Sequence, residues 1–476
     1  MNCADDILKI RADIAGLSVF SALKRHPLVQ SLDALLADLS RVSSSDGPLV
    51  ADLRPDVSPL DLIRDWANFT EILVRRNQGG SFYAQIYFLT ITDDNPFTRC
   101  LESRSCHPTL YALAVSDLSR LGRIASFDLP GLGALLASLL EKAGLGESAV
   151  HIEEAARLIS STDSGGLTSG VSLGIPAGLF SKNADWGKSL SVLADYIRTH
   201  GAGELGLYRS FSWASSVQAT SVAALRPVLN PDPIGLADLS GYEDQRSIVT
   251  ANTLRFLEGK PANNLLLYGD RGTGKSATVK AVCHEYAHRG LRLIEVRKEH
   301  LPELPAILDT LASRALRFIV FIDDLSFEST GDSFTSFKGL LEGGVESRPD
   351  NVVVYATSNR RHLVKERRSD RPNSAEAANA ADTGDVRAFD TMQEQFSLAD
   401  RFGVTVVYTA PTQDEYLQIA CFIGRQRGVL GTGEAELQHF RDNALRWERW
   451  FNGRSPRTAV QYVEWVAGGA GFPWET

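Results

Sequence analysis

The sequence predicts an α/β domain built on a parallel sheet and preceded by a mainly helical N-terminal domain. From Ile234 onward, helical segments alternate with short apolar strands, the pattern of a parallel sheet covered by helices. Within this part, one strand runs directly into Gly-x-x-x-x-Gly-Lys-Ser and then into a helix. Before it, apolar residues recur at three- and four-residue spacing through residues 1–160, which indicates helices.

Length and composition are those of a multidomain globular protein. The chain has 476 residues, 43% of them hydrophobic, and roughly two to four domains are expected from this length. The net charge of −9 provides no overall basic field for holding nucleic acid. No apolar run approaches the ~18 residues of a membrane span, and no basic segment followed by an apolar one opens the chain. We expect a cytoplasmic protein without a membrane segment.

The cysteines are odd in number and scattered, which fits a reducing compartment rather than a disulfide scaffold. They are Cys3, Cys100, Cys106, Cys283 and Cys421. Cys100, Cys106 and the adjacent histidine have side chains that bind zinc, but no second Cys/His pair completes such a site.

The N-terminal domain is expected to span residues 1–230. A Ser-, Thr- and Gly-rich stretch at residues 161–182 predicts a loop, residues 186–200 return to helical spacing, and residues 207–213 alternate like a strand. Three prolines then mark the domain boundary near residue 230, at Pro227, Pro231 and Pro233.

The α/β domain is expected to span residues 231–411, followed by helices and a Trp-containing tail over residues 412–476. Its strands are predicted at residues 265–269, 291–296, 318–322 and 352–356. Residues 366–392 are rich in Arg, Ala, Asn and Asp, and we interpret them as a loop.

The Gly-x-x-x-x-Gly-Lys-Ser segment predicts a phosphate-binding loop. Glycines let successive backbone N–H groups turn toward an anion, and the following helix adds its positive N-terminal dipole. Lys275 is placed to reach the β- and γ-phosphates, and Ser276 to offer its hydroxyl to Mg²⁺. The predicted nucleotide contacts are Gly269, Asp270, Arg271, Gly272, Thr273, Gly274, Lys275, Ser276 and Ala277.

Two further strands end in polar side chains suited to the same chemistry. The apolar strand at 318–322 is followed by Asp323, the expected Mg²⁺ partner, and by Asp324, which is placed to polarise an attacking water. Both follow the carboxyl end of a strand, where ligands bind in open α/β sheets. The strand at 352–356 leads to Asn359, our choice for holding that water or touching the γ-phosphate, with Thr357 second.

Two arginines follow, Arg401 and Arg457, and a guanidinium stabilises the charge on a transferring phosphoryl group. This order of motifs resembles that of the AAA+ ATPases. The sequence of residues 323–328 and 356–363 also resembles that of an uncharacterised bacterial family of predicted AAA-type ATP-binding proteins of unknown function. The resemblance is strong over residues 232–470 and extends to the initiator and helicase-loader branch, whose sensor strand ends in Thr-Ser-Asn-Arg.

The resemblance implies ATP and Mg²⁺ as ligands, Asn359 as first sensor and Arg457 as second sensor in cis. It implies that Arg401 is a finger reaching a neighbouring subunit, so a homo-oligomer is expected with ATP bound. It also implies a helical lid from about residue 412 and an adenine pocket lined by Leu239, Ser240, Gly241 and Tyr242.

The acidic pair departs from the usual Asp-Glu of AAA+ proteins. Here it is Asp323-Asp324, and the shorter side chain places its carboxylate roughly 1.5 Å further back, the length of one bond. A misplacement of ~1 Å costs on the order of a hundredfold in rate, so slow hydrolysis is expected unless Glu328 contributes. Residues 297–312 carry no aromatic pore-loop pattern, so the threading of protein chains is not supported.

Three functions are therefore considered. The first is a slow ATPase whose nucleotide state switches assembly or the binding of an unidentified protein partner. The second is an ATP-binding interaction platform with little hydrolysis. The third is a DNA-associated loader or initiator, motivated by a basic run that is interleaved with Glu366 and Asp370. The run consists of Arg360, Arg361, Lys365, Arg367, Arg368 and Arg371.

Overall fold

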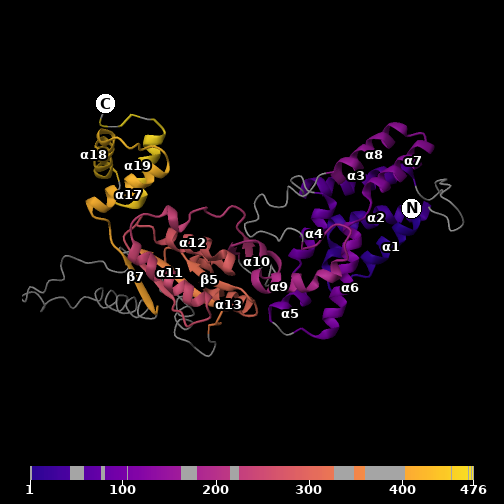
Figure 1. The fold of residues 1–476 in the computed structure, drawn as a ribbon, viewed down its shortest axis with the longest axis horizontal. Helices are drawn as coiled ribbons and strands as arrows, with labels where there is room; N and C mark the ends of the chain where they lie inside the picture. Colours follow the sequence, from indigo (N-terminus) through magenta and orange to yellow (C-terminus); the bar gives the residue numbers. More distant parts are fainter. Residues whose placement is uncertain are drawn as a thin grey trace, which may run out of the picture. The chain divides into compact units, whose positions relative to one another are not determined.

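The computed structural model divides into two compact units, Met1–Tyr208 and Arg209–Thr476 (Figure 1). It describes residues 3–42, 58–76, 81–103, 106–161, 179–214, 225–325, 348–359, 402–451, 453–469, 471, 472 and 474. The loops expected at 366–392 and over most of 161–182 lie outside these residues.

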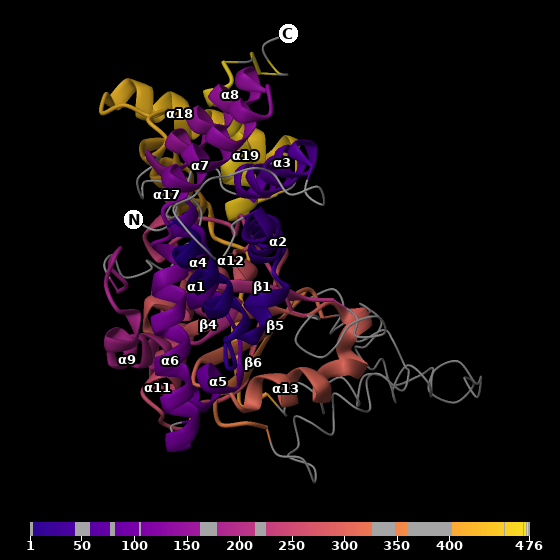
Figure 2. The same ribbon diagram turned by 90° about the vertical axis from the view of Figure 1, so that its right-hand side faces the viewer.

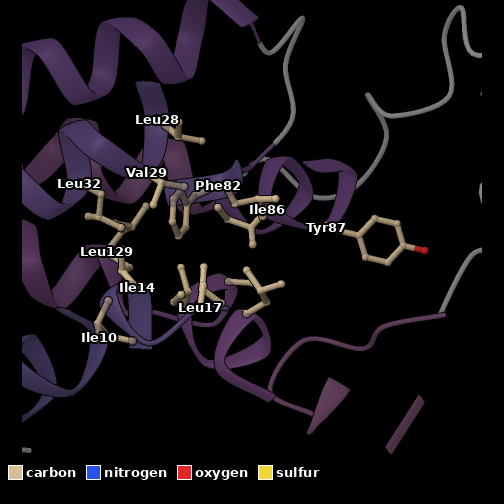
Figure 3. Packing of buried hydrophobic residues seen from close by; sticks show 14 of the residues in the cluster. Ile10, Ile14, Leu17, Leu28, Val29, Leu32, Phe82, Ile86, Tyr87 and Leu129 are labelled. Carbon is tan, nitrogen blue, oxygen red and sulfur yellow. The ribbon is translucent and has the colours of Figure 1, made fainter. Parts of the chain in front are cut away.

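The N-terminal unit is helical, as predicted. Its longer helices are α1 (Cys3–Ala15), α2 (Pro27–Val42), α3 (Pro59–Arg76), α4 (Phe82–Thr92), α5 (Pro96–Glu102), α6 (Pro108–Ala125), α7 (Leu129–Lys142), α8 (Gly146–Ser161), α9 (Leu190–His200) and α10 (Gly203–Leu207). Short 3₁₀ helices lie at Ser21–Arg25 and Trp186–Ser189. Apolar faces at helical spacing meet in one core, which includes Ile14, Leu32 and Ile86 (Figure 3).

A buried carboxylate fixes the turn between α1 and α2. Asp117 of α6 is fully buried, and its Oδ2 accepts the backbone N–H groups of Ser18, Val19 and Phe20 at 2.8, 2.7 and 3.1 Å. Arg120 donates to Oδ1 at 3.2 Å and balances the charge. Backbone N–H groups in a turn need acceptors when they are buried, and here a single carboxylate oxygen accepts three of them.

We expect Asp117→Ala to destabilise the N-terminal unit by about 3 kcal/mol, because it strands buried N–H groups and removes the carboxylate to which Arg120 donates. Urea denaturation followed by circular dichroism measures this as a shift of the N-terminal unit's transition. Asp195, whose side chain is 77% exposed and paired with Arg198, is the matched control. Asp195→Ala should change stability by less than about 0.5 kcal/mol, and an equally small effect at position 117 would contradict the assignment.

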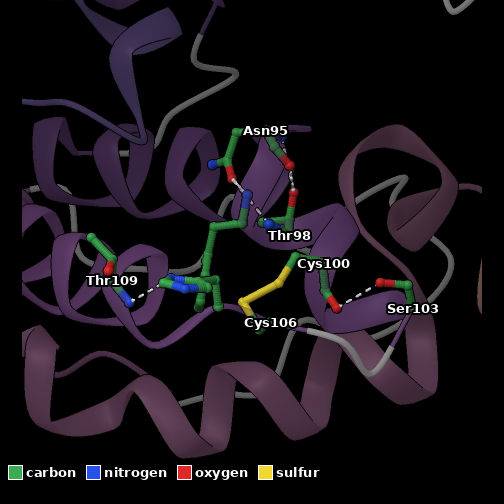
Figure 4. The surroundings of a disulfide bond; sticks show 8 residues. Asn95, Thr98, Cys100, Ser103, Cys106 and Thr109 are labelled. Carbon is green, nitrogen blue, oxygen red and sulfur yellow. Dashed lines mark hydrogen bonds between the residues drawn. A yellow bond between two sulfur atoms is a disulfide. The ribbon is translucent and has the colours of Figure 1, made fainter.

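Cys100 and Cys106 form a disulfide between the end of α5 and the start of α6 (Figure 4). Their Cα atoms lie 5.1 Å apart, within the range that a disulfide bridges. The expectation of scattered, unpaired thiols is therefore wrong for this pair, because the end of α5 and the start of α6 bring together cysteines that are six positions apart. Cys283 and Cys421 are free and buried.

Among the described residues, no single helix has both the length and the apolar character to cross a membrane, although the bent pair α6 and α7 meets these criteria jointly.

The second unit contains a seven-stranded sheet in the order β2-β1-β4-β5-β6-β3-β7, parallel except for the pair β1 and β2. The strands are β1 (Ser210–Trp213), β2 (Leu225–Pro227), β3 (Leu265–Gly269), β4 (Leu291–Glu295), β5 (Arg317–Ile322), β6 (Val352–Asn359) and β7 (Val404–Tyr408). The four strands predicted in this region are confirmed as β3, β4, β5 and β6.

The boundary between the two units lies earlier than the predicted position near residue 230. Strand β1 pairs in parallel with β4, with Phe211 opposite Ile294, so the segment after Tyr208 belongs to the sheet. Of the three prolines, Pro227 is the last residue of β2, at the edge of the sheet, where a missing N–H is tolerated, and Pro231 and Pro233 follow this strand.

Helices cover both faces of the sheet. Figure 2 shows β4, β5 and β6 between α11 and α13. These helices and α12 have the bounds Glu243–Leu257 (α11), Lys275–Tyr286 (α12) and Leu304–Ala312 (α13). Strands β5 and β6 are buried on both faces, which explains why their sequences read as continuous apolar runs.

Three C-terminal helices form a subdomain with its own core, which we call the lid. They are α17 (Gln413–Gln426), α18 (Glu434–Trp450) and α19 (Pro456–Ala467). Aromatic rings gather on α18 and α19: the Trp447 ring lies 5.4 Å from Trp465 and 6.5 Å from Trp474. Trp447 is buried, whereas Trp450 is 60% exposed.

Candidate functional site

A cleft of about 980 Å³ opens at the carboxyl ends of the central strands. Its lining combines segments far apart in the sequence: the phosphate loop, the ends of β5 and β6, residues before α11, and the lid. Of the predicted site residues, it is lined by Arg271, Gly272, Thr273, Gly274, Lys275, Ser276, Ala277, Asp323, Asp324, Asn359 and Arg457. The structure thus brings these side chains together, while their roles stay predictions.

The phosphate loop has the backbone that its glycines predict. Gly269, Gly272 and Gly274 have φ angles of 141°, 76° and 90°, in the region that side chains disfavour. At Gly269 a Cβ atom would lie 1.9 Å from the Tyr408 carbonyl oxygen. The close approach of β7 therefore requires glycine at this position, and helix α12 begins at Lys275, at the end of the loop.

Lys275 is buried and folds back onto the loop. Its ammonium donates to the carbonyl oxygens of Gly269 at 3.1 Å and Asp270 at 2.6 Å. Burial lowers the pKa of Lys275 to about 8, against the opposing attraction of Asp270, Asp323 and Asp324. A bound anion would favour the charged form of this buried side chain and so raise its pKa.

The residues predicted to hold Mg²⁺ are in contact. Ser276 Oγ donates to Asp323 Oδ1 at 2.6 Å, and Thr357 Oγ1 donates to the same oxygen at 2.5 Å. Hydroxyl and carboxylate oxygens are the ligands that Mg²⁺ prefers, so this donor set fits the ion.

Asp324 is held by two neighbours in an unusual backbone conformation. Its N–H donates to Thr357 Oγ1 at 2.9 Å, and Asn359 Nδ2 donates to its Oδ1. Its φ angle is +52°, which aspartate and asparagine tolerate better than longer side chains. Aspartate in place of the usual glutamate thus suits the left-handed backbone at position 324. Thr357 contacts both acids of the pair, Asp323 and Asp324.

The segment expected to line the adenine pocket reaches the same cleft. Leu239, Ser240, Gly241 and Tyr242 all contribute to its wall. The Tyr242 ring packs 5.2 Å from that of Tyr408, and its hydroxyl donates to the Thr409 carbonyl at 2.8 Å. Apolar and aromatic walls beside a phosphate loop suit the binding of a flat base.

The lid contributes Arg457, which the sequence analysis identified, and other residues that it did not identify. The Arg457 N–H donates to the Gly272 carbonyl at 3.2 Å, which joins α19 to the phosphate loop. Gln426 of α17 donates to Asp238 at 2.5 Å across the cleft wall. Five further lid residues line the cleft, Ile419, Ile423, Arg427, Pro456 and Val460. The i, i+4 spacing of the two isoleucines indicates an apolar helix face, but the spacing does not show that this face lines the cleft.

Arg401 and the alternative base Glu328 lie outside the described residues, as does the basic run at residues 360–371.

Comparison with known proteins matches residues 207–470 to a family described as "Protein of unknown function (DUF815)". The 26S proteasome regulatory subunit 6B homolog of Schizosaccharomyces pombe is 31% identical over 125 residues, 23% of this chain and 32% of that protein. Two solved structures of RuvB from Thermotoga maritima share 16% and 14% identity at TM-scores of 0.33 and 0.28. They cover 50% and 49% of this chain and 65% and 72% of their own.

The family match covers more than half of the chain and includes every predicted site residue, from Gly269 to Arg457. The phosphate loop follows β3 in the middle of a mostly parallel sheet, the acidic pair follows β5, and a helical lid comes after β7. The chain therefore belongs to the DUF815 family of proteins of unknown function and has the fold of an AAA+ ATPase.

Proposed function

We propose that this protein binds ATP with Mg²⁺ in the cleft between the phosphate loop and the lid. The observation that carries the proposal is the contact of Ser276 with Asp323 beside the buried ammonium of Lys275. A phosphate chain would meet the backbone N–H groups of the loop and Lys275, while Ser276 and Asp323 would hold the metal ion. Bound Mg²⁺ would neutralise charge on the phosphates.

We further propose slow hydrolysis that switches assembly. Asp324 would orient the attacking water, and Asn359, which donates to its Oδ1, would hold the carboxylate in place. In this state one carboxylate oxygen of Asp324 is already engaged, which favours a low rate. The nucleotide bound would then set whether subunits, or a protein partner, associate.

Calorimetry and a phosphate-release assay on the wild-type chain test both parts. We expect saturable Mg-ATP binding together with measurable but slow turnover. Binding without turnover would favour the interaction platform over the ATPase, whereas no binding would contradict the proposal altogether.

Arg401 is proposed to complete the site of a neighbouring subunit, as the finger of an AAA+ protein would. Arg401→Ala subunits should bind ATP but lose turnover, because the phosphoryl charge lacks its guanidinium. Mixing them with Lys275→Ala subunits should restore part of the activity, since one variant supplies the pocket and the other the arginine. A wild-type chain that stays monomeric with ATP, by light scattering, and still turns over at full rate would refute the trans role.

A further inference from the structure

The connection from the sheet to the lid is short and stiff. Strand β7 ends at Tyr408 and α17 begins at Gln413, so few residues separate the two. Pro411 has a fixed φ, and Thr412 caps α17 by accepting the N–H of Glu415 at 3.3 Å while Glu415 Oε2 accepts the Thr412 N–H at 2.7 Å. The direction of α17 therefore follows the backbone of residues 408–411.

Asp270, the second residue of the phosphate loop, contacts this connection through both its backbone N–H and its side chain. Its N–H donates to the Tyr408 carbonyl at 2.9 Å, and its Oδ2 accepts the Ala410 N–H at 2.8 Å. The position is a variable one in the Gly-x-x-x-x-Gly-Lys-Ser pattern, so the pattern itself does not require an acid there. A carboxylate bonded to a backbone N–H forms a charge-assisted hydrogen bond, stronger than a neutral one.

The same residue also contacts the lysine proposed to meet the phosphates. The Asp270 carbonyl accepts the Lys275 ammonium at 2.6 Å and the Thr273 hydroxyl at 2.8 Å. If the Lys275 ammonium turned to bound phosphates, it would release the Asp270 carbonyl. The hydrogen bonds of the Asp270 backbone would then change when a nucleotide binds. Its contacts with Tyr408 and Ala410 belong to the lid connection.

We propose that Asp270 is a positioning residue that couples the occupancy of the phosphate loop to the lid. A rearrangement of the Asp270 peptide would be passed through Ala410 to the first turn of α17. The coupling rests on the proposed binding of nucleotide, and it assigns to Asp270 a task that differs from the phosphate contact of the loop N–H groups.

Hydrogen exchange of the full chain, with and without a saturating non-hydrolysable ATP analogue and Mg²⁺, tests the coupling. Calorimetry establishes that each variant is saturated. In the wild type, α17, α18 and α19 should exchange more slowly when the analogue is bound. Asp270→Ala should lose at least half of this change, whereas Asp270→Asn, which keeps an oxygen to accept the Ala410 N–H, should retain it. Asp414→Ala, which removes an exposed carboxylate from the first turn of α17, is the matched control and should respond like the wild type.

The outcomes separate the two proposals. An Asp270→Ala variant that is saturated and shows the full wild-type lid response would overturn the coupling and leave ATP binding intact. Loss of all binding in this variant would assign Asp270 to binding instead, which also overturns it. A wild type that binds no analogue would contradict the proposed function. If the alanine variant does not fold, Asp270→Leu removes the same acceptor while filling its space, and the same criteria apply.

Discussion

Lys275→Ala is expected to weaken ATP binding by about a thousandfold. The ammonium would make charge-assisted bonds to two phosphates, and losing about 4 kcal/mol of such contacts corresponds to this factor. Among the described residues, the ammonium donates to the carbonyls of Gly269 and Asp270 and is attracted by nearby carboxylates, so the stability of the variant is measured beside its affinity. Isothermal titration calorimetry measures the change, and the melting temperature shows whether the fold is kept.

The pH dependence of binding provides a second measurement on the same residue. Because burial lowers the pKa of free Lys275 to about 8, the ammonium is present at pH 7 and is lost as the pH rises above 8. Bound phosphates would raise this pKa, so ATP affinity in the wild type should fall as the pH rises through 8. Lys275→Met keeps the buried stem without the charge and should show no such fall. Equal affinity of wild type and Lys275→Ala would refute the site.

Asp324→Asn is expected to lower turnover by about 10² to 10⁴-fold while ATP stays bound. The amide cannot accept a proton, and general bases contribute an acceleration of this order. The substitution is conservative in structure, since asparagine adopts a φ of +52° readily and its Oδ1 can still accept from Asn359 Nδ2. Single-turnover hydrolysis, measured beside calorimetric affinity, separates the chemical step from binding.

Asp324→Glu is the informative companion to that variant. Glutamate restores the reach that AAA+ proteins usually have, but the left-handed backbone costs it about 1 kcal/mol of stability. Turnover of Asp324→Asn at the wild-type rate would exclude Asp324 as the base, and Glu328→Gln measured in the same assays would then decide whether Glu328 takes that role.

The central part of the fold could be predicted from sequence because its signals are local. A continuous apolar run as short as β5, rich in β-branched and aromatic residues and followed by Asp323 and Asp324, favours a buried strand. The glycines of the phosphate loop predict positive φ angles, which Gly272 and Gly274 have. Parallel strands then bring their carboxyl ends to one edge, so the meeting of Ser276 with Asp323 follows from topology.

The remaining features depend on contacts that no local pattern encodes. Strand β1 is short, and its place beside β4 is fixed by pairing across residues far apart in the chain. The disulfide requires the turn between α5 and α6 to bring Cys100 and Cys106 together. Arg427 lines the cleft because the connection from β7 sets the direction of the lid helices. Helical periodicity in the sequence does not encode that direction.

The aromatic cluster of the lid has an optical consequence. Four of the seven tryptophans, Trp447, Trp450, Trp465 and Trp474, lie in α18, α19 and the segment after them. Excitation near the red edge of indole absorption therefore produces fluorescence to which this subdomain contributes four of the seven emitting side chains. Trp450 is largely exposed and Trp447 is buried, so rearrangement of the lid should change both the wavelength and the intensity of emission. Lid movement can thus be followed in the unlabelled protein on the millisecond scale of a stopped-flow experiment.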